Sequence, residues 1–399
     1  MASTAQASSL PAHHARNAAL ACAVVLAVAL GVGRFAFTPL LPLMLKSGAL
    51  DIRHGGWLAS ANYAGYLVGA LSCAAIRIDH ARMVRLALAW TIALTLAMAL
   101  VHLFPLWAAI RFAAGVVSAW AFVFASQWGL RQLAELDAHG LAGVIYAGPG
   151  VGIVATGLLG AAAAALGVSA PSVWAGFALC SAVAGALVWK AFAHRPSAMR
   201  GRAHVAAPVA NAPARADSIG LVGLYGLAGF GYIITATFLP VIARQALPGS
   251  PWPDLFWPAF GLALIVGALV AARLPLSWDN RLLCAACYLI QALGIWLGIV
   301  FPGVLGFGIG SLLLGLPFTA ITLFAMREAR RLRGESAAGL MGYATASYGL
   351  GQIAGPLVAA PIAARTGSFS IALWIAVAAL GLGAAGLIWL GLRATARAA

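Results

Sequence analysis

The sequence predicts an all-α integral membrane protein with twelve transmembrane helices in two pseudo-symmetric six-helix halves. Its composition, its apolar stretches of membrane length and an internal repeat lead to this fold class. Of the 399 residues, 63% are hydrophobic and only 8% are charged, whereas roughly a quarter of a soluble domain is charged. Because 24 basic and 9 acidic residues are too few to cover a globular surface in water, a soluble enzyme and a disordered chain are both excluded.

Apolar stretches long enough to span a bilayer, about 20 residues each, follow one another along the chain. Charged residues, prolines and glycine clusters separate them. In chain order, the expected spans are 17–45, 55–76, 84–103, 106–130, 141–166, 172–192, 218–243, 255–274, 281–301, 303–326, 337–364 and 369–392. The first span resembles a signal peptide because Arg16 precedes an apolar run. Its repeat in the second half indicates that it is retained.

Lys and Arg residues in the loops predict the orientation. With the N-terminus in the cytoplasm, 18 of the 24 lie on the inside, as the positive-inside rule requires. These are Arg16, Arg77, Arg82, Arg85, Arg131, Lys190, Arg195, Arg200, Arg202, Arg215, Arg273, Arg281, Arg327, Arg330, Arg331, Arg333, Arg393 and Arg397, and the four outside are Lys46, Arg53, Arg244 and Arg365. We therefore expect a multi-pass protein of the plasma (inner) membrane with both termini cytoplasmic. Topology explains the net charge of +15, so no nucleic acid partner is predicted.

The longest polar stretch, His194 to Asp217, contains three prolines and lies near the middle of the chain. It predicts a cytoplasmic linker, residues 193–217, between an N-terminal six-helix bundle (17–192) and a C-terminal one (218–392). Residues 1–16 and 393–399 are expected to be cytoplasmic tails.

The second half repeats the first at a nearly constant offset. A shift of 198 residues places Gly31-Val-Gly33 on Gly229-Phe-Gly231, and a shift of 200 places Gly115 on Gly315. A shift of 199 places Gly140, Gly143, Gly150 and Gly152 on Gly339, Gly342, Gly349 and Gly351. Three helix pairs with similar offsets indicate a duplication. Parallel halves related by an axis along the membrane normal are a transporter architecture.

Three motifs within the spans carry a resemblance to a known family. They are Gly-Arg-Phe-Ala-Phe-Thr-Pro-Leu-Leu-Pro at 33–42, Asn-Tyr-Ala-Gly-Tyr at 62–66 and Gly-Phe-Gly-Tyr-Ile-Ile-Thr-Ala-Thr-Phe-Leu-Pro at 229–240. With the twelve spans and the central linker, these motifs resemble the YbfB/YjiJ-like branch of the major facilitator superfamily. The resemblance implies alternating access, with the substrate at the midplane between the halves and helices 1, 4, 7 and 10 lining the cavity.

Superfamily motifs are unevenly present. Arg111-Phe-Ala-Ala-Gly115 resembles a helix 4 pattern associated with energy coupling, and the sequence at 148–152 resembles a helix 5 pattern associated with exporters. The motif between helices 2 and 3 is poor, because Ala75 stands where the superfamily has Gly. The residues expected to act in gating or helix flexibility are Gly31, Gly33, Pro39, Asp79, Gly148, Pro149, Gly152, Gly355 and Pro356.

Arg34 and Arg111 lie within apolar spans. An arginine at that depth costs at least a few kcal/mol unless it faces water or a partner. Arg34 is about 11 residues from the outer end of its helix, roughly 16 Å deep, and Arg111 about five residues, roughly 8 Å. Both are expected to face the cavity. Two alternatives stay open: Arg111 extends to the outer headgroups, and Arg34 binds backbone carbonyls that Pro39 and nearby glycines set free.

No acid within the spans is available to neutralise Arg34. All nine carboxylates lie in loops or at helix ends. A fixed positive charge without an internal counter-ion predicts an anionic ligand, because guanidinium binds carboxylate or phosphate through two parallel hydrogen bonds. We therefore expect an organic anion or a carboxylate-bearing zwitterion as substrate. The eight histidines also lie at ends or in loops, so the usual proton carrier is lacking, and proton coupling, uniport and exchange all stay open.

Uncharged polar residues at comparable depth complete the predicted site. Asn62 and Tyr66 lie on one face of helix 2, and Tyr232 occupies in helix 7 the place that Arg34 has in helix 1. The predicted substrate-binding residues are Arg34, Asn62, Tyr66, Arg111, Tyr232, Thr235, Tyr348 and Gln352. The alternative for each uncharged residue is packing between membrane helices.

No catalytic residue, cofactor or metal site is predicted. The five cysteines lie in apolar stretches, and the dinucleotide-like Gly381-Leu-Gly383-Ala-Ala-Gly386 lies inside an apolar helix with no preceding strand. The leading prediction is a monomeric secondary active or facilitative transporter whose partners are a small-molecule substrate and the lipid bilayer. The alternatives are a drug or metabolite efflux transporter of the same fold and a non-transporting membrane sensor or assembly protein.

Overall fold

The computed structural model describes residues 2–193 and 212–398, and this part of the chain forms helices without any strand. The α-helices are α1 (Ala2–Leu26), α2 (Phe37–Lys46), α3 (Ile52–Ser72), α4 (His80–Leu100), α5 (Phe104–Glu135), α6 (Ala142–Ala165), α7 (Ala170–Val188), α8 (Ala212–Ala246), α9 (Pro253–Ala271), α10 (Asn280–Val300), α11 (Val304–Gly315), α12 (Phe318–Arg333), α13 (Ala337–Thr366) and α14 (Ser370–Ala398). The shorter elements are a π-helical turn, η1 (Ala27–Val32), and three 3-10 turns, η2 (His139–Leu141), η3 (Trp189–Phe192) and η4 (Gly334–Ser336).

These elements make twelve membrane-length units. Two of the units are interrupted, because α1, η1 and α2 form one broken helix and α11 and α12 form another. Each unit overlaps one of the twelve predicted spans, which confirms the predicted fold class. Pro317 causes the second break, since proline disrupts a helix interior.

Ten of the twelve units are long and apolar enough to cross a bilayer. The other two, α3 and α13, carry the polar side chains Asn62, Tyr66, Tyr348 and Gln352. These two helices pack against each other across the two halves. Their lower apolarity therefore reflects faces turned toward protein, a condition under which polar groups are tolerated at membrane depth.

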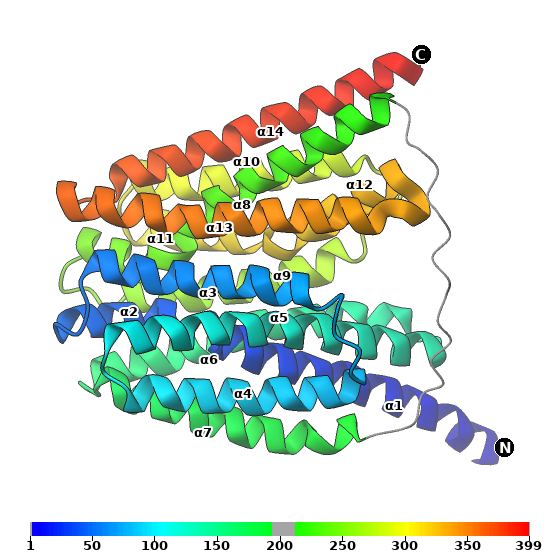
Figure 1. The fold of residues 1–399 in the computed structure, drawn as a ribbon, viewed down its shortest axis with the longest axis horizontal. Helices are drawn as coiled ribbons and strands as arrows, with labels where there is room; N and C mark the ends of the chain where they lie inside the picture. The colour runs from blue at the N-terminus through cyan, green and yellow to red at the C-terminus, as the bar shows by residue number, and fades with distance from the viewer. Residues whose placement is uncertain (1, 194–211, 399) are drawn as a thin grey trace.

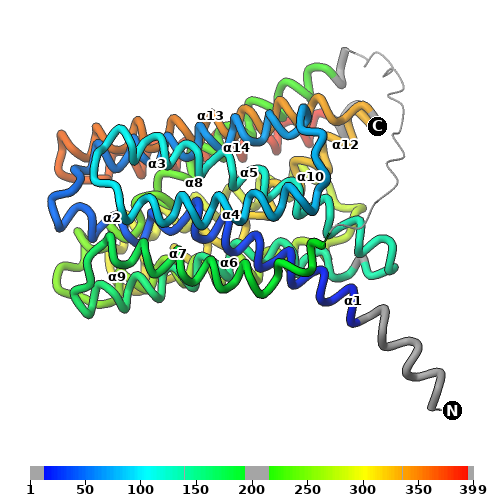
Figure 2. The backbone as a smooth tube through the Cα atoms, turned by 60° about the horizontal axis from the view of Figure 1, so that its bottom comes forward, coloured from blue at the N-terminus to red at the C-terminus, as the bar shows by residue number. Residues whose placement is uncertain are grey.

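The bundle has two chemically different ends. In Figure 1, α1 begins and α14 ends at the same end of the bundle. The α3–α4 connection with Arg77, the α9–α10 connection with Arg273 and the end of α12 with Arg330 lie at that end as well. We call it the basic end and the other the opposite end. Figure 1 shows α4 and α7 of the first half at one side of the bundle and α10 and α14 of the second half at the other. In the turned view of Figure 2, α3 of the first half lies beside α13 of the second.

The two halves repeat the same close helix crossings. Gly115 of α5 packs against the backbone of Asn62 in α3, and Gly315 of α11 packs against the backbone of Phe260 in α9. Likewise, Gly31 packs against Gly152, and Gly229 packs against the backbone of Tyr348. A Cβ at any of these glycines would collide with backbone. The glycines that recur in the sequence repeat therefore mark positions where two helices are in close contact.

Some helices extend beyond the predicted bundle limits. α1 begins at Ala2, within the predicted tail 1–16, and α14 reaches Ala398, within the predicted tail 393–399. α8 begins at Ala212, inside the predicted linker 193–217, and residues 194–211 of that linker lie outside the described residues. The division into bundles, linker and tails stays a prediction.

Hydrogen bonds join the halves from the middle of the bundle toward the opposite end. Thr38 donates its hydroxyl to the carbonyl of Ala236 at 3.2 Å, and the hydroxyls of Tyr63 and Thr237 are 2.9 Å apart. Ser60 donates to the carbonyl of Ile353 at 2.9 Å. All of these residues lie closer to the opposite end than Arg34 does, so that end of the interface between the halves is held shut.

Candidate functional site

The candidate site is built around the break in helix 1. The amides of Gly33 and Phe35 bond five residues back, to Val28 and Leu30, at 3.0 and 2.9 Å, which widens the helix into a π-turn. Pro39 has no N–H to offer the carbonyl of Phe35, and the amide of Thr38 takes that carbonyl at 3.2 Å instead. The helix therefore breaks over residues 33–36, and the carbonyl of residue 34 leaves the helical ladder.

Arg111 of α5 fills the vacated hydrogen-bonding positions. Its guanidinium donates to the carbonyls of Gly33 at 3.1 Å and Arg34 at 2.9 Å, and its side chain is only 2% exposed. The side-chain amide of Asn62, itself fully buried, donates to the carbonyl of Arg111 at 2.8 Å. Extension of Arg111 to the headgroups is therefore wrong, because its donors point inward to main chain rather than outward.

Arg34 projects from the break toward the second half. Its Nη2 donates to Oε1 of Gln352 at 2.9 Å, and its guanidinium carbon lies 3.9 Å from the ring centroid of Tyr66 and 5.2 Å from that of Tyr63. The side chain is 4% exposed, and its Nε has no hydrogen-bond partner. Arg111, and not Arg34, caps the freed carbonyls, so the alternative reading of Arg34 as a backbone cap is also wrong.

The second half contacts Arg34 through a neutral group. Gln352 donates its amide to the hydroxyl of Tyr232 through a short hydrogen bond. The ring of Tyr348 stacks between those of Tyr232 and Tyr225, with centroids 5.8 and 4.6 Å away. The structure therefore brings Arg34, Tyr66, Tyr232, Tyr348 and Gln352 of the predicted site together, with Asn62 and Arg111 behind the broken helix.

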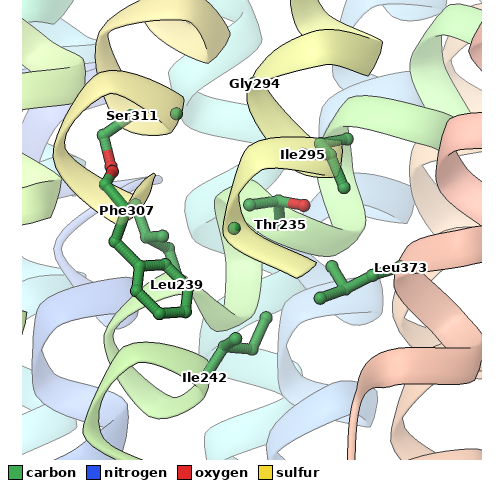
Figure 3. A pocket seen from close by; sticks show the side chains of 10 residues that line it. Thr235, Leu239, Ile242, Gly294, Ile295, Phe307, Ser311 and Leu373 are labelled. Atoms are coloured by element: carbon green, nitrogen blue, oxygen red, sulfur yellow. The ribbon is translucent and has the colours of Figure 1, made fainter. Parts of the chain in front are cut away.

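Thr235 faces a different place. It lines a cavity of about 20 Å³ within the second half, between α8, α10, α11 and α14 (Figure 3). Its hydroxyl is buried and has no hydrogen-bond partner. Thr235 lies about one helical turn beyond Tyr232, and its side chain lines this separate cavity within the second half. A hole of this size holds about one water molecule.

Sequence reasoning missed three aromatic residues beside the site. The ring of Phe35 lies 6.2 Å from that of Trp257 and 6.0 Å from that of Phe318, and Phe318 meets Tyr232 edge to face at 5.2 Å. The indole N–H of Trp257 is buried without a partner. In the sequence, an aromatic residue that lines a site within an apolar span looks like an aromatic residue that only packs. Pro317, next to Phe318, was the local signal that a helix is interrupted there.

Most of the predicted gating residues lie at close contacts between helices. Gly148 packs against the backbone of Ala23, and Gly355 packs against Ile233 of α8. The Pro356 carbonyl lies 3.1 Å from the Cβ position of Gly56. Asp79 caps α4, where its carboxylate accepts the amide of Arg82 at 3.1 Å. The remaining predicted residues are Gly31 and Gly152, which touch each other, Gly33 and Pro39 at the helix 1 break, and Pro149 within α6.

Carboxylates gather far from Arg34, at the basic end of the second half. Arg281 is 3% exposed and contacts Asp279 at 3.2 Å and Glu328 at 3.5 Å, and Glu328 accepts from Arg331 at 2.9 Å. Desolvation works to raise the pKa of Asp279, but hydrogen bonds from the side chain and backbone of Arg281 outweigh it and lower that pKa. Within the described residues Arg34 makes no ion pair.

Comparisons with known proteins agree with this architecture. A family model described as "Uncharacterised MFS-type transporter YbfB" matches residues 26–390. Among solved structures, the chain is similar to a crystal structure of a mutant of the nucleoside transporter NupG, with a TM-score of 0.76 and 13% sequence identity over 94% of this chain and 99% of that chain. At this identity the likeness concerns the fold alone. No curated protein matches the chain.

Proposed function

The chain belongs to the YbfB-like family of major facilitator transporters, and from this premise we propose that it carries a small organic anion, with Arg34 as the group that binds the anion. Family and fold make it a multi-pass membrane transporter rather than an enzyme. We also propose how transport is coupled and how the protein is oriented in the membrane.

The unsatisfied guanidinium of Arg34 carries the proposal. A buried arginine keeps its charge, and in a membrane protein it needs a partner. Gln352 supplies one neutral acceptor to Nη2, and the Nε of Arg34 has none. A carboxylate would supply two acceptor oxygens and the missing negative charge in one group, which is the geometry that guanidinium binds best. An uncharged solute would leave the charge uncompensated.

The hydrogen bond between Arg34 and Gln352 also links substrate binding to movement of the halves. Arg34 lies in the first half and Gln352 in the second, at the point where the closed part of their interface begins. An anion that takes over the guanidinium would compete with Gln352 and loosen this link. Rocking of the halves about a midplane site would then expose the site to the other side.

Orientation and coupling follow from the charges. The basic end is cytoplasmic by the positive-inside rule, which places both termini in the cytoplasm of an inner-membrane protein. The hydrogen bonds and ring contacts of Arg34 within the described residues involve no carboxylate or histidine, so proton coupling through a buried acid is not supported. Exchange or uniport by a monomer is the simplest mechanism.

Reconstituted transport tests the proposal. The purified chain in proteoliposomes is supplied with radiolabelled organic anions or with an uncharged nucleoside, the solute named for the structural neighbour, and empty liposomes give the leak. We expect uptake of an anion, and a loss of at least about 30-fold in Arg34→Ala, since truncating one partner of a buried charged contact costs about 2 kcal/mol or more.

A matched control separates this effect from general damage. Arg365, exposed at the end of α13, serves as Arg365→Ala and should leave uptake unchanged. Unchanged anion uptake in a correctly inserted Arg34→Ala protein, or uptake of the nucleoside alone, would overturn the proposal. Absence of any transport across a wide panel would favour the sensor or assembly alternative.

A further inference from the structure

The walls around Arg34 are aromatic, and they come from both halves. We define the aromatic wall as Phe35, Tyr66, Tyr232, Trp257, Phe318 and Tyr348. Ring contacts connect its members, from Trp257 through Phe35 and Phe318 to Tyr232 and Tyr348. The guanidinium of Arg34 lies against Tyr66 and bonds the amide that holds Tyr232. The wall and the anion-binding group thus form one site.

Part of the aromatic wall remains accessible from inside the bundle. Tyr66 and Tyr348 keep partial exposure. Among the large hydrophobic side chains of α13, the most exposed are Tyr343, Leu350 and Leu357, which recur every seven residues along one face. Tyr348 projects almost half a turn away from that face. In α3 the same argument separates Tyr66 from the exposed face that carries Leu71. The accessible ring surface therefore faces the interior between the halves.

The site offers one cationic group for one negative charge. Arg111, the neighbouring arginine, donates from both Nη atoms to the carbonyls of residues 33 and 34, and its Nε is buried without a partner behind the broken helix. A second carboxylate on the ligand would be buried without a cation, which is costly. The charge inventory therefore fits a monoanion and disfavours a dicarboxylate.

The remaining contacts fit a flat, apolar ligand body. The rings of Tyr225, Tyr348 and Tyr232 are nearly parallel, with interplanar angles of 24° and 18°. Both faces of Tyr348 are therefore covered, and its free edge favours the face of another aromatic ring in an edge-to-face contact. The hydroxyls of Tyr63 and Tyr225 already bond Thr237 and Thr322, so few free polar groups remain for a polyhydroxylated carbon chain. The unpartnered N–H of Trp257 is one of them.

We propose that this site selects a planar aromatic monocarboxylate of the benzoate type. This inference rests on the proposed function, because it assumes that Arg34 binds the carboxylate. It adds that the ring of the ligand lies against the aromatic wall, with Tyr348 as the residue that discriminates a flat ring from a saturated one.

Binding to the detergent-purified full chain tests the inference without passive leakage of weak acids. The probes are benzoate, cyclohexanecarboxylate, which has the same charge on a saturated ring, and terephthalate, which adds a second carboxylate. Dissociation constants come from the ligand-induced thermal shift. We expect benzoate to bind about five-fold more tightly than cyclohexanecarboxylate, as one added aromatic contact of about 1 kcal/mol allows, and terephthalate to bind more weakly than both.

Variants distinguish the failure of this inference from the failure of the proposed function. Tyr348→Leu should abolish the preference for benzoate while both monocarboxylates still bind, and Arg34→Ala should abolish both. Phe307→Leu is the matched control, because Phe307 stacks on Phe256 away from the site and should leave the preference intact. Equal binding of the two monocarboxylates, with both still dependent on Arg34, would overturn the inference alone. Binding that ignores Arg34→Ala would overturn the proposed function as well.

Discussion

The broken helix α1–α2 of the first half and the continuous helix α8 of the second half are equivalent members of the repeat. The shift of 198 residues that superimposes their Gly-x-Gly and Leu-Pro sequences places Pro39 on Thr237 and Arg34 on Tyr232. Pro39 removes a backbone donor and helix 1 breaks, whereas Thr237 keeps its donor and α8 runs unbroken from Ala212 to Ala246. Two positions thus distinguish the helices: Pro39 against Thr237 for the break, and Arg34 against Tyr232 for the charge.

The partner helices differ in step with this change. At the shift of 200 residues, Arg111 of α5 corresponds to Ser311 of α11. Arg111 binds the carbonyls at the break, whereas Ser311 donates to the carbonyl of Phe307 in its own helix at 2.7 Å. Pro39 and Arg111 therefore act together. The proline leaves backbone carbonyls without a backbone donor, and the arginine donates hydrogen bonds to carbonyls at the break. The continuous helix α8 needs neither.

The largest expected effect comes from removing the side chain that satisfies the break. Arg111→Ala leaves two buried carbonyls without donors, so we expect it to lower the free energy of unfolding by about 3 kcal/mol. Ser311→Ala, the equivalent change in the second half, should cost less than about 1 kcal/mol. Equilibrium unfolding in detergent measures both. Equal losses would mean that Arg111 has no special role at the break.

Converting the first half toward the second should weaken binding. Pro39→Thr restores a backbone donor, which allows helix 1 to close and moves Arg34 away from Gln352. We expect about a ten-fold loss of anion affinity, equivalent to about 1.4 kcal/mol, measured by thermal shift with benzoate. Pro42→Ala is the control, because Pro42 has a proline counterpart, Pro240, in the continuous helix. A Pro39→Thr protein with full affinity would show that the break does not position Arg34.

The cavity at Thr235 sharpens the boundary of the site. Thr235→Val replaces a buried, unpartnered hydroxyl by a methyl group of similar shape, so we expect a gain of about 1 kcal/mol in stability. Anion affinity should not change, because Thr235 lies in the separate cavity of about 20 Å³. A loss of anion affinity in this variant would show that Thr235 does belong to the substrate site.

The smallest expected effect is a pH dependence confined to the second half. Because the folded-state pKa of Asp279 is lowered, its contribution to stability is present above the unfolded pKa of about 3.9 and is lost as the pH falls further. Asp279→Asn should therefore flatten the acid side of the unfolding profile below about pH 4. Thermal unfolding across pH 3 to 6 measures it, and an unchanged acid slope would show that the contacts of Asp279 add nothing.

Sequence reasoning predicted most of the residues that the structure brings together around Arg34, but not their individual contacts. Arg34, Tyr66, Tyr232, Tyr348 and Gln352 were predicted together because polar residues in apolar spans are costly and therefore few. It assigned Arg111 to the substrate, since a buried arginine that binds backbone and one that binds ligand look alike in a sequence. It missed Trp257 and Phe318 for the converse reason, because aromatic residues in apolar spans are ordinary.

The twelve spans, the internal repeat and the intramembrane polar residues can be identified from the sequence, because burial in lipid, glycine packing and charge placement depend on local composition and spacing. Which arginine binds a carbonyl and which binds Gln352 depends on the packing of the helices. Hydrogen bonds act over about 3 Å, and whether two groups come that close depends on how helices cross and where one of them breaks. That distinction makes Arg34 the free charge and Arg111 its support.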